Sequence, residues 1–200
     1  MDRLFLLMLL ASPLHAGEVE LGDLPSLLAG ADVVVLGEVH DNPTHHAVQA
    51  EVVAALKPTA LVFEMLTPAQ ADAVMAAPRG DVEAVERAAG WQGWPDFSMY
   101  YPIFVAAPTA RISGGAREIG TIRRAMTEGA AAVFGPQAAR FGLAQALPAA
   151  ELAARAEAQV AAHCGQLPQE VAVKMVEAQR LRDADFARAA VAAFEELGGP

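Results

Sequence analysis

The sequence contains one cysteine, Cys164, in 200 residues. A single thiol excludes an internal disulfide, so the fold must be stabilised by the burial of apolar side chains. Hydrophobic residues make up 54% of the chain, which is enough for a sizeable core within one domain. We expect Cys164 to be a buried core residue rather than a metal ligand or a reactive thiol, because unpaired cysteines are commonly buried.

Positive charge is scarce as well. The 14 Lys and Arg residues stand against 24 Asp and Glu residues, which gives a formal net charge of -10. Phosphate binding requires clustered Lys and Arg, so this composition argues against nucleic acid as a partner. The sequence also has no Gly-rich phosphate loop and no Gly-x-Ser-x-Gly motif, which argues against the enzyme classes that depend on them.

The N-terminal apolar run, residues 4–11, is too short to span a bilayer. It follows Arg3 and precedes Leu14-His15-Ala16, a plausible cleavage point for a secretory signal peptide. We therefore predict a signal peptide over residues 1–16 and one domain over residues 17–200, with a periplasmic or secreted location. The alternative is an apolar N-terminal helix of the fold. Because no cysteine lies near this leader, a lipoprotein anchor is not expected.

A second apolar run, residues 33–36, is typical of a fully buried strand, because three of its four residues are β-branched. The run ends at Gly37 and is followed by Glu38, His40 and Asp41. In open α/β sheets, ligands bind beyond the carboxyl ends of the strands. These three polar residues therefore stand where a binding site is expected.

Another strand is predicted over residues 60–63, and a helix over residues 43–56 connects it to the first. The helix begins where Asn precedes Pro, a pair that favours a helix N-terminus. A strand, a helix and a strand with short links predict a βαβ unit with parallel strands. The carboxyl ends of both strands then meet at one edge, so Glu38, His40 and Glu64 should converge on one crevice.

Two chemical roles suit Glu38, His40 and Glu64. They are ligands of the types that hold a divalent metal ion, and they also fit a general base with its orienting partner. The structural alternative is that a glutamate caps the next helix or pairs with a core arginine. We favour a functional role, because burying unpaired carboxylates is costly. His45 and His46 are adjacent on the predicted helix, so they cannot both bind one metal ion from it.

Both tryptophans and both tyrosines lie within residues 91–104. Such a cluster is typical of the core of a small helical lobe. It also suits a flat apolar pocket for a planar ligand, in which a tyrosine could supply an anionic oxygen to iron(III). The sequence leaves both interpretations open.

The rest of the chain predicts a mixed fold. Helices are expected over residues 68–90 with a break at 78–80, over 117–127, 148–162 and 167–197, and a short third strand over 110–113. The predicted fold class is α/β, a mostly parallel sheet flanked by helices with a helical lobe. We place the sheet core at about residues 30–66 and 108–135, and the helical lobe at about residues 68–104 and 148–197.

Several motifs together resemble the ChaN family of haem-binding uptake proteins, in the Tiki/TraB/EreA-like superfamily. They are Leu36-Gly37-Glu38-Val39-His40-Asp41-Asn42-Pro43 with His45-His46, Val62-Phe63-Glu64-Met65, Trp94-Pro95-Asp96-Phe97 with Tyr100 and Pro102-Ile103-Phe104, His163-Cys164-Gly165, Ala178-Gln179, and Arg182-Asp183-Ala184. They cover most of residues 30–190 in the family's order.

The resemblance implies a haem-binding protein that forms a homodimer around two stacked haems and works with the haem and iron uptake machinery of the bacterial envelope. It implies that a tyrosine binds the iron. Tyr100 matches the family's tyrosine best, and the adjacent Tyr101 is the alternative. A histidine of the other subunit would hold the haem propionates, and His40, His45, His46 and His163 are the candidates. A tyrosinate ligand favours iron(III) and suits haem transport.

Two functions of different classes follow. The first is haem binding for uptake or storage, with Tyr100 as the iron ligand. The second is metal-dependent hydrolysis of the Tiki/EreA-like type, with Glu38, His40 and Glu64 at the active site; an inactive remnant is a third possibility. Family members continue into a further strand beyond the position of Gly199-Pro200, so we expect a C-terminally truncated sheet of reduced stability.

Overall fold

The computed structural model describes residues 17–93 and 95–199, so the predicted signal peptide lies outside the described residues. Helices surround a small parallel sheet, which confirms the predicted α/β fold class. The elements are η1 (Leu21–Asp23), α1 (Leu24–Leu28), α2 (Pro43–Leu56), β1 (Ala60–Phe63), α3 (Pro68–Ala76), α4 (Val82–Ala89), α5 (Phe97–Ala106), β2 (Arg111–Gly114), α6 (Ile119–Glu128), α7 (Ala130–Phe134), α8 (Ala149–Ala162) and α9 (Gln169–Leu197).

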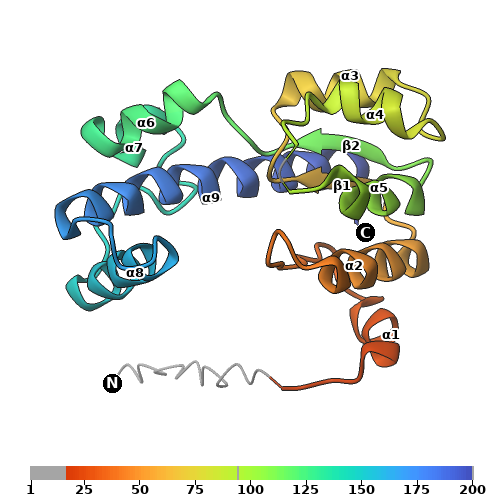
Figure 1. Ribbon diagram of the computed structural model, residues 1–200, viewed down its shortest axis with the longest axis horizontal. Coiled ribbons are helices and arrows are strands. Elements are labelled where there is room, and N and C mark those ends of the chain that lie inside the picture. The colour runs from red at the N-terminus through yellow and green to blue at the C-terminus, as the bar shows by residue number, and fades with distance from the viewer. Residues whose placement is uncertain (1–16, 94, 200) are drawn as a thin grey trace, which may run out of the picture.

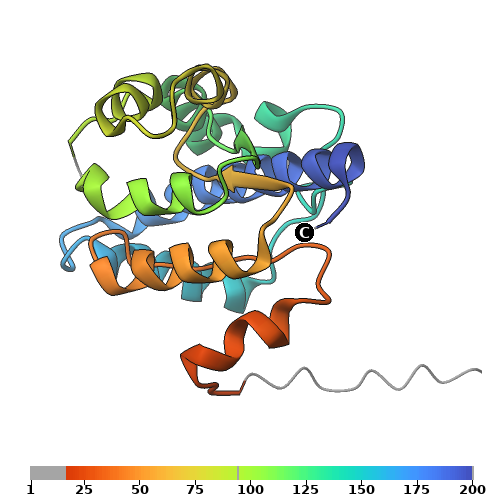
Figure 2. The ribbon, with the colours of Figure 1, turned by 90° about the vertical axis from the view of Figure 1, so that its right-hand side faces the viewer.

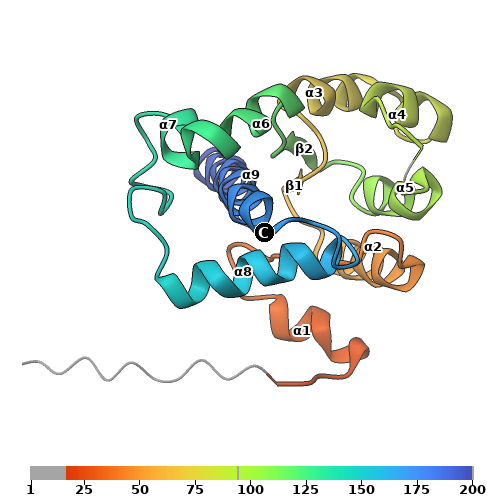
Figure 3. The same cartoon turned by 60° about the vertical axis from the view of Figure 1, so that its left-hand side comes forward.

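The molecule has two lobes joined by the long helix α9 (Figure 1). The sheet lobe contains β1, β2 and helices α2 to α5, and the distal lobe contains α6, α7 and α8 packed on α9. In Figure 3, α8 lies on one side of α9, and α6 and α7 lie on the other. Across the ranges that the structure covers, no helix is both long enough and apolar enough to cross a membrane.

The sheet consists of β1 and β2, which run parallel with Ala60 opposite Arg111 and Phe63 opposite Gly114. β2 therefore confirms the predicted third strand. It ends in glycine because a Cβ on Gly114 would lie 2.4 Å from the carbonyl oxygen of Leu66. A Cβ on Gly115 would meet Phe186 of α9 at 2.6 Å. The glycine pair thus lets α9 pass close to the carboxyl end of the sheet.

The predicted strand at residues 33–36 is wrong. This segment has no regular secondary structure and pairs with neither β1 nor β2, and Val35 has 77% of its surface exposed. A buried strand needs a neighbour on which to form its ladder, and a short apolar run does not reveal whether that neighbour exists. The helix α2 holds the end of this segment instead, because the Gln49 Nε2 donates to the Leu36 carbonyl oxygen at 3.3 Å.

The ends of α2 follow the predicted signals. Asn42 caps the helix by accepting the Thr44 N–H at 3.0 Å, and Pro43 is the first helical residue. Lys57 ends the helix in the left-handed conformation with φ 51°. The buried face of α2 includes His46 and Gln49, and it packs against α5 (Figure 2).

Local capping also sets the helices between the two strands. Thr67 and Gln70 form a reciprocal capping box at the start of α3. Asp81 caps α4 by accepting the Ala84 N–H at 3.1 Å. The predicted break at residues 78–80 is therefore confirmed.

The two lobes have different cores. In the sheet lobe, aromatic and branched side chains from β1, α3, α4 and α5 pack together, and Phe63 stacks on Phe104 with ring centroids 4.2 Å apart. In the distal lobe, the buried clusters contain mostly alanine with a few larger residues such as Phe134 and Leu181. Cys164 lies between α8 and α9 and is exposed, so the prediction that it is buried is wrong.

Candidate functional site

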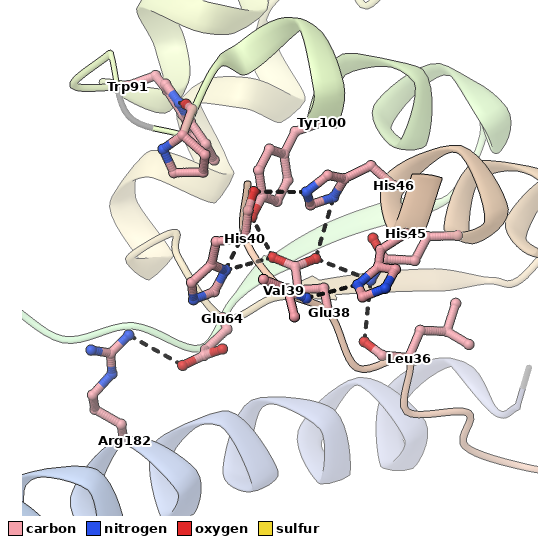
Figure 4. A network of polar contacts seen from close by, with 12 residues as sticks. Leu36, Glu38, Val39, His40, His45, His46, Glu64, Trp91, Tyr100 and Arg182 are labelled. Carbon is pink, nitrogen blue, oxygen red and sulfur yellow. Dashed lines mark hydrogen bonds and ion pairs between the residues drawn. The ribbon is translucent and has the colours of Figure 1, made fainter. Parts of the chain in front are cut away.

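Glu38 is the centre of a polar network at the carboxyl end of the sheet (Figure 4). The Tyr100 hydroxyl donates to Glu38 Oε1, and the His40 Nδ1 lies 2.7 Å from the same oxygen. The Gln49 Nε2 donates to Glu38 Oε2 at 3.0 Å. Burial alone raises the pKa of Glu38, but the hydrogen bonds from Tyr100, His40 and Gln49 outweigh burial and lower that pKa below its ordinary value. Glu38 is therefore a carboxylate at neutral pH.

Tyr100 comes from α5 and is buried beneath the network. Its ring lies 4.1 Å from the His46 ring and 4.8 Å from the Trp91 ring, between centroids. Its hydroxyl is 3.2 Å from the His40 Nδ1. Burial, the bond to Glu38 and the negative charges of Glu38 and Glu64 raise the pKa of Tyr100. The phenol is therefore protonated at neutral pH and acts as a hydrogen-bond donor in this state.

Helix α2 positions the loop that carries Glu38 and His40. The His45 Nδ1 accepts the Val39 N–H at 2.8 Å. The His46 Nε2 lies 2.9 Å from the His40 carbonyl oxygen and must donate, because a carbonyl can only accept. The fully buried His46 then presents its Nδ1, which has no hydrogen-bond partner, 3.4 Å from Glu38 Oε2. Side chains of α2 thus hold the segment that carries Glu38 and His40, whereas the sequence predicted that a strand at residues 33–36 would hold it by pairing with β1.

Glu64 lies beside this network but is paired with a different residue. Its Oε1 accepts from the Arg182 Nη2 of α9 at 3.1 Å. In Figure 4, Glu64 lies between His40 and Arg182. Glu38 and His40 are therefore brought together as predicted, whereas Glu64 points toward α9. In the part of the chain that the structure describes, no group of three or more His, Cys, Asp or Glu residues is arranged to hold a metal ion.

Two of the residues proposed from the resemblance lie elsewhere. The Tyr101 hydroxyl donates to the Arg79 carbonyl oxygen at 2.9 Å, so this side chain is directed to the turn between α3 and α4. His163 ends α8 in the distal lobe, and its Nδ1 donates to the Gln159 carbonyl oxygen at 2.8 Å. The network therefore includes Tyr100, His40 and His46, with His45 next to it.

Sequence reasoning missed Gln49 and Arg182. Gln49 carried a weak signal, because it lies three residues after His46 and so occupies the same face of the helix. A polar residue on a buried face requires partners, and here they are Glu38 and Leu36. Arg182 belongs to the motif Arg182-Asp183-Ala184, which carries part of the family resemblance, but its contact with Glu64 had no local signal because it joins residues 118 positions apart.

Comparison with known proteins agrees with this description. The family model described as "Haem-binding uptake, Tiki superfamily, ChaN" matches residues 25–199. Among solved structures, the fold is similar to that of ChaN of Campylobacter jejuni, described as showing cofacial haem binding, with a TM-score of 0.65 at 19% sequence identity. The similarity covers 86% of this chain and 71% of that chain. A search of curated proteins gives no match. Since the family model spans nearly the whole described domain, the chain belongs to the ChaN family of haem-binding uptake proteins in the Tiki superfamily.

Proposed function

We propose that this chain binds haem and that Tyr100 is the ligand of the haem iron. The family match over residues 25–199 supports haem as the ligand. The observation that carries the assignment of Tyr100 is its position: its hydroxyl contacts Glu38 and His40, whereas the Tyr101 hydroxyl is directed to a backbone carbonyl elsewhere.

The residues present fit a haem site by their chemistry. Phenol and imidazole groups are both known axial ligands of haem iron, and here they lie 3.2 Å apart in Tyr100 and His40. Iron(III), when bound, would act as a Lewis acid and would favour an anionic oxygen as its ligand. The phenol must then lose its proton, and Glu38 already accepts the hydrogen bond through which that proton would leave. Because the His40 side chain is 40% exposed while Tyr100 is buried, a ligand would approach from the His40 side.

The proposal also covers the oxidation state of the bound iron and the assembly of the chain. We infer that the bound iron is iron(III), and that haem binding joins two copies of the chain into a homodimer. Of the candidate histidines, His40 and His45 are partly exposed beside the network and could hold propionates, whereas His46 is fully buried. The description of the Campylobacter protein as a cofacial haem binder supports a symmetric pair.

We also infer that residues 1–16 direct export of the chain, and that the chain delivers haem to the haem and iron uptake machinery of the envelope. N-terminal sequencing of the exported chain tests the cleavage after Ala16.

The test is a titration of the mature chain with ferric haem, followed by absorbance and by size in solution. We expect saturation at one haem per chain, the spectrum of oxygen-ligated iron(III), and dimer formation. Tyr100→Phe should abolish that spectrum, whereas the matched control Tyr101→Phe should retain it. Absence of saturable binding to the wild-type chain would refute the proposal. An unchanged spectrum in Tyr100→Phe would move the ligand to another residue.

One observation favours a second function, metal-dependent hydrolysis. The His40 Nδ1 lies 2.7 Å from Glu38 Oε1, which is the arrangement of a histidine base held by a carboxylate. Glu64 would contribute to a metal site with Glu38 and His40 only after its ion pair with Arg182 had opened. Metal analysis of the purified chain and hydrolase assays on the wild type and on His40→Ala test this alternative. Activity that is lost in His40→Ala would support it, and metal-free, inactive protein would reject it.

A further inference from the structure

Arg182 is a partly exposed cation beside the network. Within the described residues, its one partner is Glu64, reached through Nη2 at 3.1 Å. A guanidinium carries five N–H donors in a planar fork that matches a carboxylate. The side chain is 42% exposed and that of Glu64 is 36% exposed, so both are accessible to a ligand.

The other arginines near the middle of α9 do not share this property. Arg180 is buried and donates to Glu177 and to the carbonyl oxygens of Gly142 and Gln145. Arg188 donates to Asp185 and lies over the Phe134 ring. These two side chains are used to hold the distal lobe. Arg182 instead donates to Glu64 beside the edge that carries His40, as Figure 4 shows.

We propose that Arg182 is the anion-recognising residue of this site and that it selects porphyrins with free carboxylates. This inference rests on the proposed haem-binding function. In the ligand-free chain the guanidinium is held by Glu64, and a ligand propionate takes the place of the Glu64 carboxylate when the porphyrin binds. The exchange replaces one carboxylate on Arg182 by another, so the cation remains paired.

The order in which the side chains of the site lie supports the exchange of the Glu64 carboxylate for a ligand propionate. Tyr100, Glu38 and His40 form one contact series, and Glu64 then lies between His40 and Arg182. Glu64 is close enough to Tyr100 for its charge to raise the pKa of that phenol. A porphyrin whose centre lies at Tyr100 carries its propionates at the edge of the ring, and the proposal places that edge on the side of Glu64 and Arg182. An ion pair as exposed as Arg182–Glu64 contributes little to stability, so it can open at little cost.

The test compares two porphyrins on three variants. Metal-free protoporphyrin IX and its dimethyl ester differ only in their carboxylates, and their binding is followed by quenching of protein fluorescence, which needs no iron ligation. The variants are Arg182→Gln, Glu64→Gln and the control Arg111→Gln. The control breaks the Arg111–Glu196 pair, which is also exposed and has a similar N···O distance of 3.0 Å. Urea midpoints establish that each variant folds.

We expect Arg182→Gln to weaken binding of the free acid by about tenfold and to leave binding of the ester unchanged. Glu64→Gln should tighten binding of the free acid by a few-fold, because it removes the competing carboxylate, and Arg111→Gln should change neither. Weaker acid binding in both Arg182→Gln and Glu64→Gln would mean that the pair is structural, and would overturn the inference. Equal loss for acid and ester, or no loss, would overturn it as well. If the wild-type chain binds neither porphyrin nor haem, the proposed function itself fails.

Discussion

A buried carboxylate in the distal lobe, Asp185, and a partly buried one in the sheet lobe, Glu38, are held in two different ways. In the distal lobe, Asp185 is bound by Arg117 through two N–H groups and by Arg188 through a third. In the sheet lobe, Glu38 is held by a phenol, an amide and an imidazole. Arginine is always charged, so the ion pairs of Asp185 persist at every pH at which Asp185 itself is ionised. A phenol and an imidazole can lose or gain protons, so the surroundings of Glu38 can change when a ligand binds. The comparison separates a carboxylate held by groups of fixed charge from one held by groups that can exchange protons.

Removing Asp185 should have the largest effect on stability. Its side chain is only 2% exposed, and Asp185→Ala leaves the half-buried Arg117 without its partner. We expect the free energy of unfolding to fall by about 3–5 kcal/mol, measured by urea denaturation. Asp183→Ala is the matched control, since Asp183 lies two residues away on α9 with a 55% exposed side chain. A loss at Asp185 no larger than that at Asp183 would show that Arg117 and Arg188 do not depend on this carboxylate.

Replacing Glu38 should cost less, because its partners include the Tyr100 phenol and the Gln49 amide, which water or new contacts can satisfy in part. In Glu38→Gln the new amide meets the Gln49 Nε2, so a donor faces a donor. We expect a loss of about 2 kcal/mol in the free energy of unfolding. A double-mutant cycle with Tyr100→Phe should give a coupling of about 1 kcal/mol, because the two residues share one hydrogen bond. Strict additivity would mean that the contact between Tyr100 and Glu38 contributes nothing to folding.

The smallest effect is expected at Glu177, which accepts the Ala130 N–H at 2.8 Å and pairs with Arg180 at 2.7 Å. Burial alone raises the pKa of Glu177, but these two contacts outweigh burial and lower the pKa below its ordinary value. A lowered pKa in the folded state stabilises the fold above the unfolded pKa, and this contribution disappears as the pH falls through the folded pKa.

Glu177→Gln should therefore cost about 1 kcal/mol at neutral pH, and the difference from the wild type should disappear in acid. Urea denaturation at a series of pH values measures it. Glu151→Gln is the control, because the Glu151–Arg155 pair is exposed and lies within one helix. A difference for Glu177→Gln that does not depend on pH would exclude the ionised carboxylate as the source of the stabilisation.

Elements with local signals were predictable from the sequence. The start of α2 at Asn42-Pro43 and of α4 at Asp81 follows from hydrogen bonds between residues two or three positions apart. The strand at residues 33–36 failed for the opposite reason, because a strand depends on a partner that the local sequence does not specify. The same limit applies to Arg182, whose partner Glu64 is distant in sequence.

The site was predicted in part, and by an argument that was only partly right. Glu38 and His40 do meet, but not because residues 33–36 pair with β1. They meet because His45, His46 and Gln49 of α2 hold the loop between residues 36 and 40. Glu64 does end β1 beside this loop, as the βαβ argument required, although its carboxylate pairs with Arg182. The sequence thus predicted where Glu64 lies but not the partner of its carboxylate, because that partner comes from a helix distant in the chain.

Helix α9 connects the packing of the distal lobe to the position of Arg182 at the sheet edge. Its 29 residues give a rod about 43 Å long that carries the distal-lobe contacts at Glu177, Arg180 and Asp185 and, among them, Arg182. The helix passes closest to the carboxyl end of the sheet where Phe186 faces Gly115. The position of the Arg182 guanidinium along the edge of the sheet is therefore set in part by the packing of the distal lobe on α9, through residues that do not contact the Tyr100 network.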